Sequence, residues 1–516
     1  FKNKFKNSKS GFLRNDYLFK KNQFFNIISE VVYLLLKFLQ KNSQTMNRRK
    51  FFRNGSLFAI GATVLNPFEG NAHGLDFDTL KKNKKAKNII VIVSDGMSIG
   101  TLNMADIYLN RKTGTGSNWI QLYKDNKVTR SLMDMSSATS IVTDSAAASS
   151  SWGSGFRVKN GSLNVGIKGE EYIPIWQKFK KAGKMAGCVT TVPITHATPA
   201  GFCIASKSRN SQESIAEMYL DLKFDIMMGG GNNYFSSESR KDKRDLYQEF
   251  SNNGFSVVKN KSQMLACDNS KPILGVFNHD GLPYSKDRES SKELTASIPS
   301  LAEMTACAID KMKNNPNGFV LQVEAGKVDW AAHGNDIAGL LYDQVAHDEA
   351  IKVAIDFAEK DKNTLVIITT DHGNANPGII YGKDANTNFD SIQKYKQTND
   401  WILNGIGQET TVSQVIDRIE YANKTILKED EAKEILNFYS NIKLEEGLYN
   451  PRHLPFKVLA DIQKKYNSVG WISMDHSADY SELAMYGPGS DLLKPFIKNT
   501  DLHYLMLEAA EVENKF

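Results

Sequence analysis

The sequence predicts an α/β protein, a three-layer sandwich whose large, mostly parallel sheet carries helices on both faces. Five- to seven-residue runs, mostly apolar and rich in β-branched residues, recur along the chain as buried strands do. They are Ile89–Ser94, Gly187–Val192, Phe224–Met228, Phe319–Glu324, Thr364–Thr370 and Glu482–Tyr486. Segments with helical patterns lie between them, as at Tyr172–Ala182 and Leu301–Lys313. Strands that alternate with helices favour a parallel sheet covered on both faces.

Residues 379–470 depart from this alternation, because they are polar and contain no strong strand pattern. Apolar side chains recur there at helical spacing in two groups. These are Val412, Val415, Ile416 and Ile419, and Ala432, Ile435, Leu436 and Tyr439. We therefore expect a helical insertion, residues 379–470, within one large domain of residues 73–516. It could restrict access to a site, carry a dimer contact, or be a surface excursion without a role.

The composition is that of a soluble globular protein, with 41% hydrophobic and 24% charged residues. The net charge of +6 comes from the first 72 residues, which hold 13 Lys or Arg and 3 Asp or Glu. The remaining residues hold 51 basic and 55 acidic side chains. We therefore predict no nucleic-acid-binding surface.

The basic leader has the pattern of an export signal. Met46 precedes the pair Arg48-Arg49 and two phenylalanines, and a weakly apolar stretch and small residues follow up to Ala72. This pattern resembles a bacterial twin-arginine signal over residues 46–72, although a chance arginine pair is the alternative. We expect residues 1–45 to be an upstream extension that is not native, and the mature protein to be periplasmic or secreted. The mature chain should have no membrane span.

Acidic residues end three of the predicted strands. Asp95 follows the first strand, Glu324 ends a second, and Asp371 ends a third. In open α/β sheets, ligands bind beyond the carboxyl ends of the strands. Because a buried charge without a partner is very costly, three carboxylates at one sheet edge predict bound metal ions.

Histidines accompany these carboxylates. Asp329 and His333 are four residues apart, so on a helix they share a face and could bind one zinc ion, although a simple Asp–His hydrogen bond fits equally well. His372 follows Asp371, and His476 lies late in the chain. Two zinc sites can be assembled from these side chains. They are Asp329, His333 and His476 for one, and Asp95, Asp371 and His372 for the other.

Ser145 is the candidate nucleophile. It precedes three alanines, so it could begin a helix whose positive end attracts an anion, although an N-cap serine without chemistry is the alternative. Thr198, in the segment that begins at His196, offers a hard oxygen ligand for Mg²⁺. Arg209 could grip two phosphate oxygens, although taken alone it would be a surface charge.

Together these segments resemble the alkaline phosphatase family. The motifs, in the family's order, are Val93-Ser-Asp95-Gly-Met, Thr143-Asp-Ser145-Ala-Ala, His196-Ala-Thr198-Pro-Ala, Leu321-Gln-Val-Glu324-Ala-Gly-Lys-Val-Asp329 with His333, Thr370-Asp371-His372-Gly and His476-Ser. One such motif would be weak evidence, but six in order make coincidence very unlikely.

The resemblance implies a homodimeric phosphomonoesterase with two Zn²⁺ and one Mg²⁺ that acts through a phosphoserine. It implies that Asp95, Asp371 and His372 hold the zinc that activates Ser145, and that Asp329, His333 and His476 hold the zinc at the leaving group. Asp95, Thr198 and Glu324 would hold Mg²⁺, with His196 as a further candidate at this third metal site, and Arg209 would hold the phosphate. Some family members have an acidic residue where His196 stands, so the third metal could be held more weakly here.

Two alternatives remain at this point. A phosphodiesterase, a sulfatase or a phosphoglycerate mutase would belong to the same superfamily. Ser145 lacks the C/S-x-P-x-R context of a sulfatase, and Arg209 favours monoesters. The other alternative is an exported metal- or phosphate-binding protein without catalysis. It would lack a ligand or the nucleophile, and the sequence contains all of them.

Overall fold

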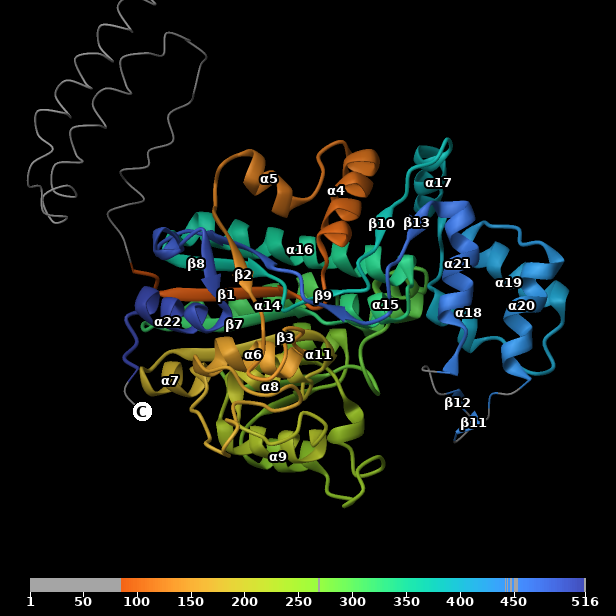
Figure 1. Ribbon diagram of the computed structural model, residues 1–516. Coiled ribbons are helices and arrows are strands. Elements are labelled where there is room, and N and C mark those ends of the chain that lie inside the picture. The colour runs from red at the N-terminus through yellow and green to blue at the C-terminus, as the bar shows by residue number, and fades with distance from the viewer. Residues whose placement is uncertain are drawn as a thin grey trace, which may run out of the picture. The chain divides into compact units, whose positions relative to one another are not determined.

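A ten-stranded sheet crosses the protein in the order β16-β2-β15-β8-β1-β7-β3-β4-β6-β5 (Figure 1). The computed structural model describes residues 85–267, 270–440, 442, 444–445, 448–449 and 453–514. The strands are β1 (Asn88–Ser94), β2 (Thr129–Asp134), β3 (Met185–Pro193), β4 (Ile226–Gly230), β5 (Ser256–Val258), β6 (Ile273–Val276), β7 (Phe319–Ala325), β8 (Thr364–Thr369), β15 (Ser481–Tyr486) and β16 (Phe496–Lys498). Only β15 runs antiparallel to its neighbours β2 and β8, which confirms the predicted, mostly parallel sheet.

Helices cover both faces of this sheet (Figure 1). Along β1, Ile90 and Ile92 pack into one hydrophobic core, and Ile89, Val91 and Val93 pack into the other. The first core includes residues of α4 (Ile99–Thr113), α5 (Asn118–Lys124), α11 (Lys261–Ala266), α14 (Leu301–Met312), α15 (Lys327–His333) and α16 (Ile337–Asp361). The second includes residues of α6 (Ser145–Ser154), α7 (Ile175–Lys181), α8 (Ala197–Cys203), α9 (Gln212–Leu222), α10 (Leu246–Asn252) and α22 (Asn499–Ala510). The three-layer prediction is therefore confirmed.

Element boundaries differ from the prediction where the backbone conformation forces a break. The helix expected from Tyr172 begins at Ile175, because Pro174 occupies the N-cap in an extended conformation. The strand expected from Phe224 begins at Ile226, because Lys223 ends α9 in the left-handed conformation with φ of 51°. The strands β2, β5, β6 and β16 were not predicted; two of them are only three residues long.

The predicted helical insertion forms a separate group of helices beside the sheet (Figure 1). Its helices are α17 (Ala385–Ser391), α18 (Asn399–Asn404), α19 (Val412–Asn423), α20 (Glu429–Tyr439) and α21 (Phe456–Asn467). The two ends of the insertion meet where β10 (Gly378–Ile379) pairs antiparallel with β13 (Val469–Gly470). We call α18 to α21 the helical lobe, because their apolar side chains form a hydrophobic core of their own.

The predicted export signal and upstream extension, residues 1–72, lie outside the described residues. Within the described part of the chain, no helix combines the length and the apolar character needed to cross a membrane.

Candidate metal centre and active site

Three neighbouring strands bring the predicted carboxylates to one edge of the sheet. β1 lies between β8 and β7, and the register aligns Val93 of β1 with Thr369 on one side and Glu324 on the other. Asp95 therefore leaves the sheet beside Glu324 and Asp371. All three side chains are fully buried. The arrangement expected from the sequence is thus present in the fold.

The first candidate metal group consists of Asp95, Asp371 and His372. One donor atom from each lies within 4.8 Å of the other two. His372 Nε2 is 3.2 Å from Asp371 Oδ2 and 3.6 Å from Asp95 Oδ1. The same nitrogen is 3.3 Å from Ser145 Oγ, so the candidate nucleophile lies directly beside this group.

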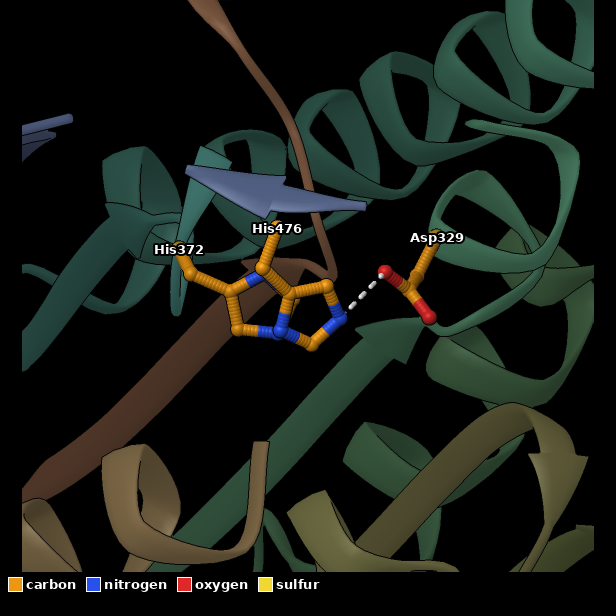
Figure 2. Close-up of side chains that lie close together, drawn as sticks. All are labelled: Asp329, His372 and His476. Atoms are coloured by element: carbon orange, nitrogen blue, oxygen red, sulfur yellow. Dashed lines mark ion pairs between the residues drawn. The ribbon is translucent and has the colours of Figure 1, made fainter. Parts of the chain in front are cut away.

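The second candidate group surrounds Asp329. Helix α15 presents Asp329 and His333 on one face, with His333 Nε2 3.5 Å from Asp329 Oδ2. His476, in β14 (His476–Ser477), points its Nε2 at the other oxygen, Oδ1, also at 3.5 Å (Figure 2). His333 Nε2 and His476 Nε2 are 3.1 Å apart. Asp329, His333 and His476 thus lie side by side, each within 3.5 Å of another.

The two groups adjoin one another. The rings of His372 and His476 stack with centroids 3.7 Å apart (Figure 2). A donor-atom cluster within 4.8 Å can also be drawn from Asp329, His372 and His476. The sequence had assigned His372 to the first group alone; in the fold it lies between both.

A third group contains His196. Donor atoms of Asp95, His196 and Glu324 lie within 4.8 Å of one another. Thr198, in α8, is buried and its Oγ1 lies 3.4 Å from Asp95 Oδ2. Asp95 is therefore common to the first and third groups.

Ser145 is the first residue of α6. The N-cap is Asp144, whose Oδ1 accepts the backbone N–H of Ala147 at 3.0 Å. The alternative that Ser145 is itself a capping residue is therefore wrong, and its hydroxyl is free to face the metal groups. Asp144 Oδ2 accepts a bond from Arg209 Nη1 at 3.0 Å, which ties the candidate phosphate ligand to the start of α6. Arg209 Nη2 lies 3.1 Å from His196 Nε2.

Burial makes the charged forms of the three strand-end carboxylates costly. Burial and the neighbouring acidic groups raise the pKa of Asp95 well above its usual value. Burial, opposed in part by the Thr190 hydroxyl, raises the pKa of Glu324 to about 7, and burial raises that of Asp371 to about 6. Buried oxygens of all three lack hydrogen-bond partners, namely Asp95 Oδ1, Glu324 Oε1 and Asp371 Oδ2. Unpaired, dehydrated carboxylate oxygens next to imidazole nitrogens fit divalent cations.

In the second group the pKa of the carboxylate is lowered rather than raised. Burial alone would raise the pKa of Asp329, but His333 and the hydrogen-bonded His476 lower it well below its usual value. Burial would lower the pKa of His476, and the bond to Asp329 raises it to about 9. Burial lowers the pKa of His372 to about 3, so its imidazole is neutral and can donate a lone pair to a metal.

The sequence and the fold were compared with those of known proteins. Residues 86–512 match the alkaline phosphatase family. Alkaline phosphatase 4 of Bacillus subtilis is 33% identical over 431 residues, which cover 82% of this chain and 88% of that protein. The chain belongs to the alkaline phosphatase family.

Further relatives agree with this assignment. The alkaline phosphatase of Escherichia coli K12 is 29% identical over 335 residues, covering 57% of this chain and 71% of that one. The crystal structure of Thermus thermophilus alkaline phosphatase superposes with a TM-score of 0.77 at 30% identity, covering 86% of this chain and 97% of that one. The protein is thus an alkaline phosphatase, a phosphomonoesterase that depends on divalent metal ions.

Three contacts of this alkaline phosphatase site were not predicted. Thr190 donates to Glu324 Oε2 at 2.5 Å, Asn374 Nδ2 donates to Asp329 Oδ1 at 2.7 Å, and Asp144 holds Arg209. Asn374 could have been found, since it lies two residues after His372. Thr190 carries no sequence signal beyond a polar residue in a buried strand.

Proposed function

We propose that this alkaline phosphatase transfers the phosphoryl group to Ser145 before water receives it. Ser145 Oγ forms a bond to phosphorus while the bond to the substrate alcohol breaks. Water then forms a bond to phosphorus as the bond to Ser145 Oγ breaks, which releases inorganic phosphate and returns a proton to the serine hydroxyl. The observation that carries this assignment is Ser145 Oγ at the start of α6, 3.3 Å from His372 Nε2 and next to the carboxylate group. The positive end of α6 favours the anionic substrate.

Arg209 is the proposed phosphate ligand. Its guanidinium has five N–H donors, of which Asp144 and His196 engage two, so further donors remain for phosphate oxygens. The bond to Asp144 orients the guanidinium before substrate arrives, so less entropy is lost on binding. The substrates are small phosphate monoesters.

The proposed metal content is two Zn²⁺ and one Mg²⁺. Asp95, Asp371 and His372 would hold one zinc, and Asp329, His333 and His476 the other. Asp95, Thr198 and Glu324, with His196 beside them, would hold Mg²⁺. A structure of a His-to-Asp variant of TAB5 alkaline phosphatase, 21% identical to this chain, has Mg bound in a site named M3. When bound, these ions would stabilise the alkoxide of Ser145, the leaving alcohol and the charge on the phosphoryl oxygens.

The variant Ser145→Ala tests the nucleophile. We expect turnover of p-nitrophenyl phosphate to fall by orders of magnitude, because no other hydroxyl replaces Ser145 Oγ, while inorganic phosphate still binds. Wild-type rates in this variant would show that the nucleophile is another group. Faster turnover of bis-p-nitrophenyl phosphate than of the monoester by the wild type would instead favour a phosphodiesterase.

We further propose that the protein is exported and forms a homodimer. The leader pattern at Arg48-Arg49 supports twin-arginine export to the periplasm or beyond, and the family resemblance supports a homodimer. Light scattering of the purified chain gives its mass directly, and a monomeric mass would contradict the dimer.

A further inference from the structure

The second metal group is joined by a hydrogen bond to Met474, a residue that packs against the core of the helical lobe. His333 Nδ1 lies 2.6 Å from the backbone oxygen of Met474. A carbonyl oxygen can only accept, so His333 carries its proton on Nδ1. Nε2 is therefore left with the lone pair and faces Asp329 and His476. The direction of the imidazole thus depends on where the Met474 carbonyl lies.

The partly buried side chain of Met474 contacts the helical lobe, although Met474 itself follows the lobe in the chain. It packs against the hydrophobic core formed by residues such as Ile402, Ile419 and Leu459, all of which are fully buried. Met474 also lies only two residues before His476. One residue therefore connects the lobe core, through its side chain, with His333, through its carbonyl.

The lobe also contacts the far end of α15. Gly334 follows His333, and a Cβ added there would lie 3.3 Å from the ring of Phe456, the first residue of α21. Asp336 Oδ2 accepts the backbone N–H of Asp400, in α18, at 3.1 Å. The Asn335 amide, oriented to satisfy its neighbours, donates to the Ser473 carbonyl at 2.9 Å. The lobe thus packs against the residues that directly follow α15, and one of these, Asn335, also bonds to the segment before His476.

We propose that the helical lobe sets the direction of the His333 imidazole, and that Met474 is the positioning residue that transmits its packing. This inference rests on the proposed function, because it takes His333 as a metal ligand. It gives the insertion a role other than restricting access or carrying a dimer contact. His333 needs such support, because its side chain is 40% exposed whereas that of Asp329 is 7% exposed.

The variant Met474→Ala tests the proposal, because it keeps the carbonyl and removes the side chain from the lobe core. We expect the apparent affinity of the chelator-stripped enzyme for Zn²⁺ to fall by about tenfold, the lower range for the loss of support to a metal ligand. The visible absorption of the Co²⁺-substituted enzyme should change as well, because it reports ligand geometry. Met474→Leu, which refills the lobe core, should restore both.

Met264→Ala is the matched control. Met264 is a buried methionine of α11 that packs in the first core of the sheet, outside the lobe and the metal groups. Because Met264 is fully buried and Met474 only partly buried, Met264→Ala should lose at least as much stability, yet keep the wild-type Co²⁺ spectrum and Zn²⁺ affinity. Equal changes in both variants would show that general destabilisation, not positioning, is responsible, and would overturn the proposal.

The variant His333→Ala tests the ligand assignment of His333 separately from the positioning role of the lobe. If this variant keeps the wild-type Co²⁺ spectrum, His333 is not a ligand and that part of the proposed function fails. If His333→Ala changes the spectrum while Met474→Ala leaves it unchanged, the ligand assignment holds and the positioning role of the lobe is wrong.

Discussion

At the scale of single residues, protons and metal ions compete for the same atoms. Burial would raise the pKa of Asp329, but His333 and His476 stabilise the charged carboxylate and lower its pKa strongly. His476 in turn keeps its proton up to a pKa of about 9, because Asp329 Oδ1 lies 3.5 Å away. An ion that binds here must displace that proton, since a metal ligand imidazole is neutral.

Zinc binding at the second group should therefore depend steeply on pH. Between pH 7 and 9 we expect the apparent affinity to rise about tenfold per pH unit and to level off above the pKa of His476. Titration of the chelator-stripped enzyme with Zn²⁺, in buffers of different ionisation enthalpy, measures both the affinity and the proton released. An affinity that is constant over this range would contradict the assignment.

The same raised pKa has a consequence for the stability of the metal-free fold. Protonated His476 stabilises that fold at pH values below about 6.5, and the contribution is lost as the pH rises through about 9. His476→Gln should remove this part of the pH dependence in urea unfolding.

At the scale of elements, the site depends on how closely α6 and α8 approach. Helix α6 begins with Ser145 and α8 carries Thr198, so their packing sets the nucleophile relative to the first and third metal groups. Gly153 and Gly201 make the approach possible. A Cβ on Gly153 would overlap the carbonyl oxygen of Gly201, and one on Gly201 would overlap Ser149.

Gly153→Ala should therefore destabilise the fold, although alanine favours helices. The added methyl meets backbone that cannot rotate away, so we expect a loss of about 1–3 kcal/mol and a lower turnover as α6 shifts. Urea unfolding and phosphatase assays measure the two effects. Gly382→Ala is the control, since nothing lies within 4 Å of its added Cβ. Equal stability of the two variants would show that the helices can separate without cost.

At the scale of the whole molecule, the position of the strand-end carboxylates at one sheet edge could be predicted from the sequence. The contacts between segments that are distant in the chain could not. Buried parallel strands leave continuous apolar runs, so Asp95, Glu324 and Asp371 could be aligned without coordinates. Contacts between distant segments leave no such pattern. The bond from Thr190 to Glu324 depends on strand register. The contact between Met474 and the lobe depends on how the chain returns to the sheet after the insertion of residues 379–470. Helical spacing predicted α19 and α20, but not what they touch.

The metal centre joins segments from residue 95 to residue 476, so metal removal should affect the whole fold. Exhaustive EDTA treatment should abolish turnover, and Zn²⁺ plus Mg²⁺ should restore it, whereas Mg²⁺ alone should not, because imidazole ligands suit zinc. Ions that bind only the native state stabilise it by about 2.7 kcal/mol for each site at a hundredfold excess over Kd. Calorimetry should therefore show a lower Tm for the metal-free protein than for the metal-loaded protein. Elemental analysis of the metal-loaded protein should give two zinc ions and one magnesium ion per chain. Full turnover in a preparation shown by elemental analysis to be metal-free would mean that these carboxylates and imidazoles serve another purpose.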